Sequence, residues 1–477
     1  MNTFVNAIKN ASTVTTNGMK ARQSTADSVV DLYYNIGASR GKDIIPTFVA
    51  AIAQDRDLAL RVAAWSRDAR GGAGERQLFR DILSYLEKND REAAIAMLPK
   101  IPELGRWDDI FVFKTDVLKT KAYTMLGDAL RAGNGLAAKW TPRKGPIANE
   151  LRAFFGMTPK QYRKSLVGLT NVVETQMCAQ DWDNINYSHV PSLAHTRYKK
   201  AFGRHGTTYA EYVTRLVKGE AGVKINAAAV FPYDVLKGRI GGYGSMKWTK
   251  TELDVIEAQW KALPNYMENS NALALVDVSG SMGCPAGGPK SKSELTCLEV
   301  AVSLGLYFAD KAEGKFKDTF LTFSAVPKLL HLKGTINQKI DQMVSSDWGM
   351  NTNITAALET ILKTAVDGRV SQSEMPDTLI ILSDMQFDQC TEKRSDSALD
   401  MIARKYKTAG YTVPNVVFWN LNASYGNAPV KFDKSGTALV SGFSPAVAAS
   451  FLGADPDAFT PEAIMRKVIM QDKYKVL

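Results

Sequence analysis

The first half of the chain carries apolar residues at helical spacing. Residues 43–53 and 57–65 each place apolar side chains three and four positions apart, with a short polar break between the two stretches. Further amphipathic stretches follow at 74–87, 90–99, 107–113, 117–132, 159–167, 170–179, 207–218 and 251–263. Short helices joined by short loops predict an α-helical solenoid, in which each helix pair buries its apolar face against the next.

The second half changes period, because short apolar runs alternate there with helical stretches. We expect strands at 272–278, 319–323, 327–331, 378–383 and 414–420, and helices at 293–312, 336–344, 354–365 and 395–408. This alternation predicts a doubly wound α/β domain with a mostly parallel sheet. The run 327–331 follows 319–323 so closely that we expect it to form the antiparallel edge strand.

These patterns divide the chain into three parts. Residues 1–265 form a helical domain, which we interpret as HEAT-like although the sequence shows no strict period. Residues 266–455 form the α/β domain. Residues 456–477 contain a C-terminal helix that starts at Pro461, after the capping residue Thr460, and that we expect to pack back on one of the two domains.

The net charge of +10 is concentrated in one segment. Residues 139–250 hold 18 Lys and Arg against 7 Asp and Glu, whereas residues 271–477 hold 21 against 22. A field of one sign over such a segment attracts polyanions, and neutralisation of phosphates is the usual reason for it. The alternative is a solvated basic surface that has no partner.

Two stretches inside this segment suit RNA. Lys139, Arg143 and Lys144 lie in or next to a loop with two prolines, which either contacts a phosphate backbone or only connects two helices. Residues 181–205 interleave aromatic side chains with cations, so that cations can meet phosphates while rings stack on bases. The candidate RNA contacts in this second stretch are His189, His195, Arg197, Lys199, Lys200, Arg204 and His205. The alternative is a helix with its apolar side in the core and its basic side in water.

Other features of the sequence limit the function classes. There is no apolar run of about 18 residues and no basic stretch followed by an apolar one at the amino terminus, so we expect neither a membrane span nor a secretory signal. The four cysteines are scattered and form no Cys-x-x-Cys pair, which argues against a disulfide framework or a zinc knuckle. We expect a reducing, cytoplasmic compartment and cysteines that fill small apolar spaces.

Residues 67–76 interrupt two helical stretches with three glycines. One interpretation is a phosphate cradle flanked by Arg70 and Arg76. The interpretation that we favour is an interhelical turn that needs a positive φ, with Asp68 and Glu75 paired to those two arginines.

The most specific chemistry lies where apolar runs end. Asp277 begins an Asp-x-Ser-x-Ser pattern after one apolar run, Asp384 ends another, and a threonine precedes a helical stretch. Ligands of α/β sheets bind outside the carboxyl ends of strands, and carboxylates and hydroxyls are the hard oxygen ligands that Mg²⁺ prefers. The sequence therefore predicts a site for Mg²⁺ or another divalent cation, with the ligands Asp277, Ser279, Ser281, Thr352 and Asp384.

Such a ligand set leaves octahedral positions for water or for an oxygen atom of a partner. The site could in principle activate a water molecule for hydrolysis. However, His331 stands alone and the sequence offers no second acidic cluster of the two-metal kind. We therefore expect an interaction site and not an enzyme.

The five cation ligands, in this order, resemble the metal-ion-dependent adhesion site of the von Willebrand factor A domain. In that family the open position typically accepts a carboxylate from a partner protein. Two residues depart from the pattern. Met350-Asn351 stands before Thr352 in place of two glycines, and Met385 follows Asp384 where glycine is common.

A helical half that carries the basic charge, joined to such a domain, resembles the Ro ribonucleoprotein family, which is defined by the TROVE domain. The stretches that look like its phage, bacterial and plant branch are 16–20, 65–76, 182–205 and 232–234. The resemblance implies a ring of HEAT-like repeats closed by the A domain, with the ends of misfolded RNA in its hole and small noncoding RNA on its outer face. The alternative function is a protein–protein scaffold that acts through a Mg²⁺-dependent A domain without RNA.

Overall fold

The computed structural model describes residues 12–15, 17–170, 172–227, 230–240, 248–267, 270–286, 295–323, 327–345, 353–387, 398–423, 427–455 and 458–477. Up to residue 261 the described chain is helical, apart from one antiparallel hairpin of β1 (Ser12–Val14) and β2 (Lys20–Arg22). The helices are α2 (Ser28–Ile36), α3 (Ile45–Gln54), α4 (Arg56–Arg67), α5 (Gln77–Asn89), α6 (Arg91–Met97), α7 (Lys100–Leu104), η1 (Trp107–Val112), α8 (Asp116–Arg131), α9 (Gly135–Trp140), α10 (Pro146–Phe154), α11 (Pro159–Leu169), α12 (Val173–Cys178), η2 (Tyr187–His189), α13 (Ser192–His205), α14 (Thr207–Val217), α15 (Pro232–Val235) and α16 (Lys250–Lys261). Each amphipathic stretch of the sequence falls on one of them.

The second half forms one mixed sheet. In the described chain its strands are β3 (Ala272–Val276), β4 (Thr319–Thr322), β5 (Leu329–His331), β6 (Thr378–Ser383), β7 (Asn415–Asn420) and β8 (Thr437–Ser441). They lie in the order β5-β4-β3-β6-β7-β8, and every pair is parallel except the edge pair of β4 and β5. The predicted antiparallel edge is therefore confirmed. β8 was missed, because its apolar run is only Ala438–Val440 and is too short to indicate a strand.

Helices connect these strands as the pattern predicts. They are α17 (Cys297–Lys311), α18 (Ile336–Ser345), α19 (Ile354–Asp367) and α20 (Ala398–Thr408), followed by the C-terminal α21 (Pro461–Ile469). α17 is apolar on most of its surface, as expected of a helix that is buried in an interior. It approaches β3 so closely that a Cβ on Gly305 would lie 2.3 Å from Cγ2 of Val276, so only glycine fits there.

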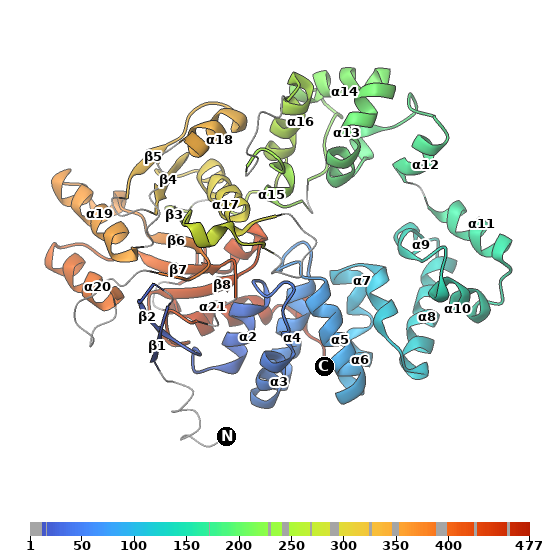
Figure 1. Ribbon diagram of the computed structural model, residues 1–477, viewed down its shortest axis with the longest axis horizontal. Coiled ribbons are helices and arrows are strands. Elements are labelled where there is room, and N and C mark those ends of the chain that lie inside the picture. Colours follow the sequence, from blue (N-terminus) through green and yellow to red (C-terminus); the bar gives the residue numbers. More distant parts are fainter. Residues whose placement is uncertain are drawn as a thin grey trace.

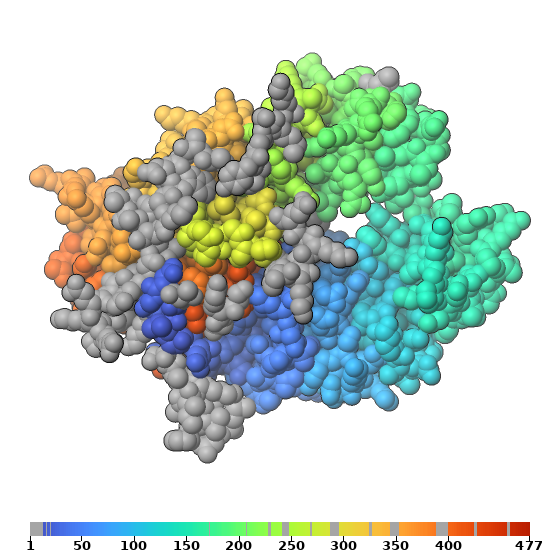
Figure 2. Space-filling model, in the orientation of Figure 1, coloured from blue at the N-terminus to red at the C-terminus, as the bar shows by residue number. Residues whose placement is uncertain are grey.

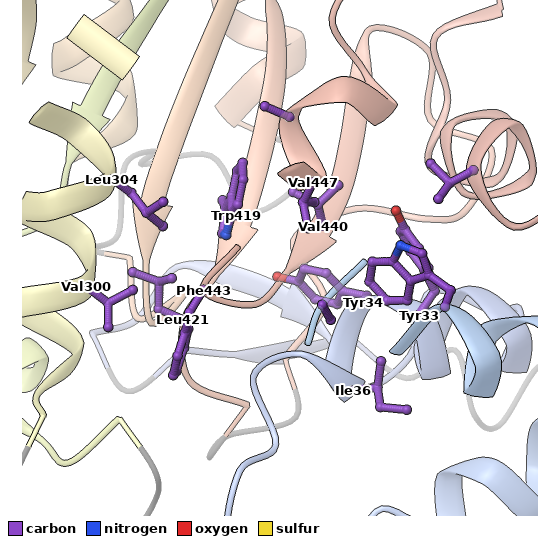
Figure 3. Close-up of a cluster of buried hydrophobic side chains, with 14 of the residues drawn as sticks. Tyr33, Tyr34, Ile36, Val300, Leu304, Trp419, Leu421, Val440, Phe443 and Val447 are labelled. Carbon is purple, nitrogen blue, oxygen red and sulfur yellow. The ribbon is translucent and has the colours of Figure 1, made fainter. Parts of the chain in front are cut away.

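The amino-terminal helices and the sheet share one hydrophobic core. Figure 3 shows Tyr33, Tyr34 and Ile36 of α2 beside Val440 and Val447, which come from β8 and the segment after it. The approach is tightest where α2 ends, because a Cβ on Gly37 would lie 2.7 Å from the Ser441 carbonyl. α21 contacts α2, α4 and β8, so the C-terminal helix lies at the junction of both parts. The sequence division at residue 265 separates two kinds of secondary structure, but this core has residues on both sides of it.

The helices follow an arc that returns to the sheet (Figure 1). A second, separate core joins α13, α14 and α16 through residues such as Phe202, Tyr209 and Val255. α16 then contacts α18, where Glu257 Oε2 accepts a hydrogen bond from Ile336 N at 2.9 Å. The helical half therefore touches the α/β domain at both of its ends. The HEAT-like nature of the helices stays a prediction.

The glycine-rich segment 67–76 is an interhelical turn. Gly74 has a φ of +72°, which explains a glycine there. Asp68 and Glu75 are ion-paired, but not to Arg70 and Arg76 as predicted. Asp68 Oδ2 accepts hydrogen bonds from Lys473 Nζ at 2.9 Å and from the Tyr474 hydroxyl at 2.8 Å, and Glu75 pairs with Arg40 at 2.7 Å. The turn thereby ties the helices to the C-terminal segment.

Candidate metal centre and basic surface

Two carboxylates meet at one edge of the sheet. β3 and β6 are parallel neighbours with Val276 opposite Leu382, and Asp277 N donates to Leu382 O at 2.9 Å. Asp277 and Asp384 therefore follow the ends of adjacent strands. The chain leaves β3 for β4 on one side, while β6 lies on the other, so this edge is the topological switch point where α/β sheets bind ligands.

Asp277 is completely buried and held by two hydrogen bonds. Its Oδ1 accepts from Ser279 N at 2.9 Å, and its Oδ2 accepts from the Ser383 hydroxyl at 2.5 Å. Burial raises the pKa of Asp277 to about 6, and the negative charge of Asp384 adds to this effect. The sequence analysis did not single out Ser383, although its position one residue before Asp384 on β6 could have indicated that it lies at this edge.

Asp384 is only 1% exposed, and burial raises the pKa of its carboxyl. Oδ1 accepts from Gln386 N at 3.2 Å, and the nearby Ser281 hydroxyl partly offsets the effect of burial. Oδ2 is buried and has no hydrogen-bond partner among the described residues. The hydroxyls of Ser279 and Ser281 lie 3.0 Å apart. Four of the five predicted ligands therefore gather at this edge, with one carboxylate oxygen left over.

The fifth predicted ligand, Thr352, lies outside the described residues, as do Met350 and Asn351. The predicted helix start is nevertheless present, because α19 begins at Ile354 and Asn353 caps it by accepting from Ala356 N at 2.9 Å. Among the described residues no group of three His, Cys, Asp or Glu side chains could hold a metal ion. A cation at this edge would therefore depend on hydroxyls beside the two carboxylates.

Met385 explains why glycine is common after the second carboxylate. Its φ is +66°, in the left-handed region that glycine adopts without strain. Its side chain is buried, so the methionine packs into the core while the backbone turns sharply after Asp384.

The amino-terminal hairpin contacts the loop that follows Asp384, which the sequence did not indicate. Thr15 Oγ1 donates to Phe387 O at 2.6 Å, and Asn17 Nδ2 donates to Gln386 O at 2.8 Å. Arg22 N donates to Ala428 O at 2.9 Å, which fixes the other end of the hairpin on the α/β domain. The candidate metal centre is thus supported by a segment more than 250 residues away in the chain.

The basic loop after α9 is built around Trp140. The Arg106 guanidinium lies 3.4 Å from the centre of its ring, and Lys139 Nζ lies 5.5 Å from it. Arg143 is exposed and donates to Thr170 Oγ1 at 3.1 Å, and Lys144 is exposed. The loop thus presents two exposed cations beside a ring that is already covered by arginine.

The second predicted stretch falls on η2 and α13. Arg197, Lys200 and Arg204 are exposed and lie three and four positions apart, so they share one face of α13. Lys199 is half-buried, with its Nζ 4.3 Å from the centre of the Trp248 ring. His189 is exposed on η2, and the exposed His205 stacks on Trp182 with ring centres 4.9 Å apart.

His195 does not lie on this surface, which corrects the prediction that it contacts RNA. It is 0% exposed, and its Nε2 lies 2.9 Å from Tyr187 O. Its ring stacks with Tyr212, with centres 5.7 Å apart, and burial lowers its pKa. It lies two turns before the buried Phe202, so both residues are on the inner face of α13, which the apolar periodicity could have indicated.

α11 carries three cations that the sequence reasoning did not single out. Lys160, Arg163 and Lys164 are exposed and lie within one turn of each other. Figure 2 shows this part of the chain and the part with α13 as two lobes on the right-hand side of the molecule. The two helices pack on different cores, because α11 packs on the core shared with the sheet and α13 packs on the second core.

Ion pairing differs sharply along the helical half. Of the 11 arginines before residue 139, seven form ion pairs, including Arg67 and Arg80 with the buried Asp109. Between residues 139 and 250 only Arg215 and Arg239 do so among the described residues. The exposed cations of the loop, α11 and α13 likewise form no ion pair within the described chain. They are Arg143, Lys144, Lys160, Arg163, Lys164, Arg197, Lys200 and Arg204.

No helix in the described part of the chain is long and apolar enough to cross a membrane.

Comparison with known proteins gives family matches without a stated activity. Residues 144–273 match the model of a domain of unknown function, DUF2828, and residues 271–475 match that of a second one, DUF7788. The uncharacterized protein L728 of Acanthamoeba polyphaga mimivirus is 29% identical over 519 aligned positions, which cover 95% of this chain and 86% of the relative.

A solved structure, the crystal structure of the Deinococcus radiodurans RO (RSR) protein, is similar over 93% of both chains with 16% identity and a TM-score of 0.34. At this degree of likeness the match carries no argument about function. The resemblance to the Ro family stays a prediction from the sequence.

Proposed function

We propose that this protein binds RNA of the single-stranded, misfolded or small noncoding kind through the cations of the loop after α9, α11 and α13, as the resemblance to the Ro family implies. We propose that it is a binding protein of the cytoplasm and not an enzyme. The observation that carries the proposal is the set of exposed cations that have no ion-pair partner in the described chain between residues 139 and 250.

Unpaired cations on a surface favour a polyanion for an electrostatic reason. An exposed ion pair contributes little to stability, so the stability of the fold does not depend on whether these cations have acidic partners. A polyanion that contacts them releases its condensed counterions, which makes binding favourable and dependent on salt. The exposed His205 stacks on the partly buried Trp182 in the same part of the chain, and this aromatic pair offers a stacking surface for unpaired bases.

Filter binding of a single-stranded RNA at two salt concentrations tests the proposal. We expect tight binding at low salt and a logarithmic slope of about −0.7 for each phosphate that is contacted. Binding that is negligible at low salt, or that does not change with salt, would contradict it. Duplex DNA of equal charge is the control for a purely non-specific attraction.

We further propose that the edge formed by Asp277, Ser279, Ser281 and Asp384 binds Mg²⁺, with Thr352 as the fifth ligand. The residues fit a hard divalent cation for two reasons. The negative charges of the two buried carboxylates repel each other, and one oxygen, Asp384 Oδ2, lacks a donor in the described chain. The cation would neutralise the pair and leave a position open for a ligand oxygen. Isothermal titration with Mg²⁺ should give a binding signal that the variant Asp277→Ala lacks.

A second candidate function is a protein–protein scaffold that acts through this site, since an open cation position suits a carboxylate of a partner. The buried Asp384 Oδ2, which accepts no hydrogen bond from the described residues, favours it. A partner that is captured by the wild type, and lost both on chelation and in Asp277→Ala, would support this function. It is compatible with RNA binding because the two surfaces are different.

A further inference from the structure

Two cysteines that the sequence left unconnected meet beside the candidate metal centre. The sulfur atoms of Cys284 and Cys297 lie 3.5 Å apart, and both are free thiols in this structure. Cys178 is an exposed free thiol at the end of α12, and Cys390 lies outside the described residues. The expectation that cysteines only fill apolar spaces therefore misses this pair.

The backbone holds the two cysteines at the base of one loop. Cys297 N donates to Cys284 O at 3.0 Å, and Pro285 pairs antiparallel with Thr296. Residues opposite each other in such a pair have Cα atoms about 4.5–5.5 Å apart, which is within the spacing that disulfides span. Rotation of the side chains is therefore sufficient to bring the sulfurs to the bonding distance of about 2 Å.

The two thiols differ in access. Cys284 is half-buried, and Asn422 Nδ2 donates to its sulfur at 3.1 Å. Cys297 is fully buried at the first position of α17, and its thiol donates to Leu421 O at 3.6 Å. A reagent in solution reaches Cys284 first, and Cys297 is placed behind it to complete the reaction.

We propose that Cys284 and Cys297 form a reversible thiol–disulfide site that reacts with a low-molecular-weight disulfide such as oxidised glutathione. Cys284 sulfur loses its proton and attacks one glutathione sulfur, so that the glutathione disulfide bond breaks and one glutathione leaves as a thiol. Cys297 then loses its proton and attacks the Cys284 sulfur, which releases the second glutathione as a thiol. Two protein thiols are oxidised, and one glutathione disulfide is reduced to two thiols.

The disulfide would tie the turn that carries Ser281 to the start of α17. Cys284 follows the 3₁₀ turn η3 (Gly280–Gly283), and its backbone N donates to Ser281 O at 3.2 Å. α17 in turn packs on β3, β4 and β6. The oxidised form therefore joins the two segments that flank residues 285–296 next to the sheet edge.

The test uses the full chain, equilibrated in glutathione buffers from reducing to oxidising, then alkylated and analysed by intact mass and peptide mapping. In the wild type and in the control Cys178→Ser we expect Cys284 and Cys297 to lose their thiols together, to appear in one linked peptide pair, and to recover both thiols with reductant. Cys297→Ser should accumulate a single glutathione on Cys284, because no second thiol can release it. Cys284→Ser should acquire no glutathione on Cys297.

Three results would overturn the proposal. The first is a lasting glutathione adduct on Cys284 in the wild type. The second is a disulfide from Cys284 or Cys297 to Cys178 or Cys390. The third is that Cys284 and Cys297 both stay free thiols at every glutathione ratio. Thermal unfolding of each reduced variant shows whether it folds. If Cys297→Ser is unstable, Cys297→Ala keeps an apolar residue in the buried position and should give the same adduct.

Discussion

The positive charges on the helices before residue 139 and on those after it differ in how many form ion pairs. In α2–α8 arginines meet carboxylates within the chain, and the pair of Arg67 with Asp109 is almost fully buried, with 3% and 0% exposed. In α9–α14 most cations face solvent without an ion-pair partner in the described chain. The first arrangement joins neighbouring helices, and the second contributes little to folding. The difference indicates that one set of charges serves the fold while the other is available to a ligand.

The sheet edge of the α/β domain offers the opposite case of uncompensated charge. Asp277 and Asp384 are buried like Asp109, but they lie beside each other and, within the described residues, form no ion pair with a cation. Buried charge without a partner is unfavourable, so it is retained most readily where a ligand supplies the compensation. Each of the following changes tests whether a charge belongs to the fold or to a ligand.

The largest effect is expected from Asp109→Ala, which leaves Arg67 and Arg80 without their shared carboxylate. Removing one partner of a buried pair should lower the free energy of unfolding by about 3–5 kcal/mol. Urea unfolding measures this loss. The matched control is Asp128→Ala, which breaks an exposed pair with Arg131 and should cost less than about 1 kcal/mol. A similar small loss in both variants would remove the distinction between the two regions.

The next effect is a pH dependence at the metal centre. Because the pKa of Asp277 is raised to about 6 from an ordinary value of 3.8, the folded state holds the proton more tightly than the unfolded state. The contribution to stability is present below pH 3.8 and is lost as the pH rises through 6, and it amounts to about 3 kcal/mol without a divalent cation. Urea unfolding in chelator at pH 5 and pH 7.5 should show roughly half of this difference, because the contribution already declines between pH 3.8 and pH 5.

Two comparisons sharpen that result. In Asp277→Asn the difference in stability between the two pH values should shrink. Mg²⁺ should raise the melting temperature of the wild type more at pH 7.5 than at pH 5, because the cation competes with the proton for Asp277. A wild type whose stability is insensitive to Mg²⁺ at both pH values would leave the two carboxylates without a ligand role.

The triple variant Arg197→Gln, Lys200→Gln and Arg204→Gln tests the free face of α13. We expect RNA affinity to fall about 10–100-fold and the salt slope to shrink by about 2, since each lost phosphate contact reduces it by about 0.7. Stability should change by less than about 0.5 kcal/mol, because these side chains have no ion-pair partner in the described chain. The control replaces the exposed Lys363, Lys407 and Lys467 by Gln, which removes equal charge outside the helical half. Equal losses in both triples would indicate an attraction to net charge only.

The smallest effect concerns the loop after α9, whose role the sequence left open. Arg143→Gln with Lys144→Gln should lower RNA affinity by roughly 3–10-fold if the loop contacts a phosphate backbone, in proportion to two lost contacts. Electrophoretic mobility shift measures it, with Lys363→Gln and Lys407→Gln as the control pair. An unchanged affinity would show that the loop only connects helices.

Local pattern was sufficient for most elements and for placing the two carboxylates, Asp277 and Asp384, at one edge of the sheet. The amphipathic stretches and the strands from 272 to 420 were predicted because side-chain periodicity is a local property, and Asp277 and Asp384 were found because they end such runs. The contacts that bridge distant segments were not predicted. The pairing of Thr15 with Phe387, of Asp68 with Lys473 and of Cys284 with Cys297 depends on how segments fold together, which no local pattern records. The prediction that His195 contacts RNA was wrong because it rested on the residue type and not on the position of the residue on α13.

Ultraviolet crosslinking of a single-stranded RNA to the full chain, with the crosslinked peptides identified by mass spectrometry, tests the central claim most directly. If the unpaired cations bind RNA, the crosslinks should concentrate in residues 139–224, on the loop after α9, α11 and α13. Crosslinks that concentrate on α2–α8 or on the α/β domain, with residues 139–224 spared, would contradict the account.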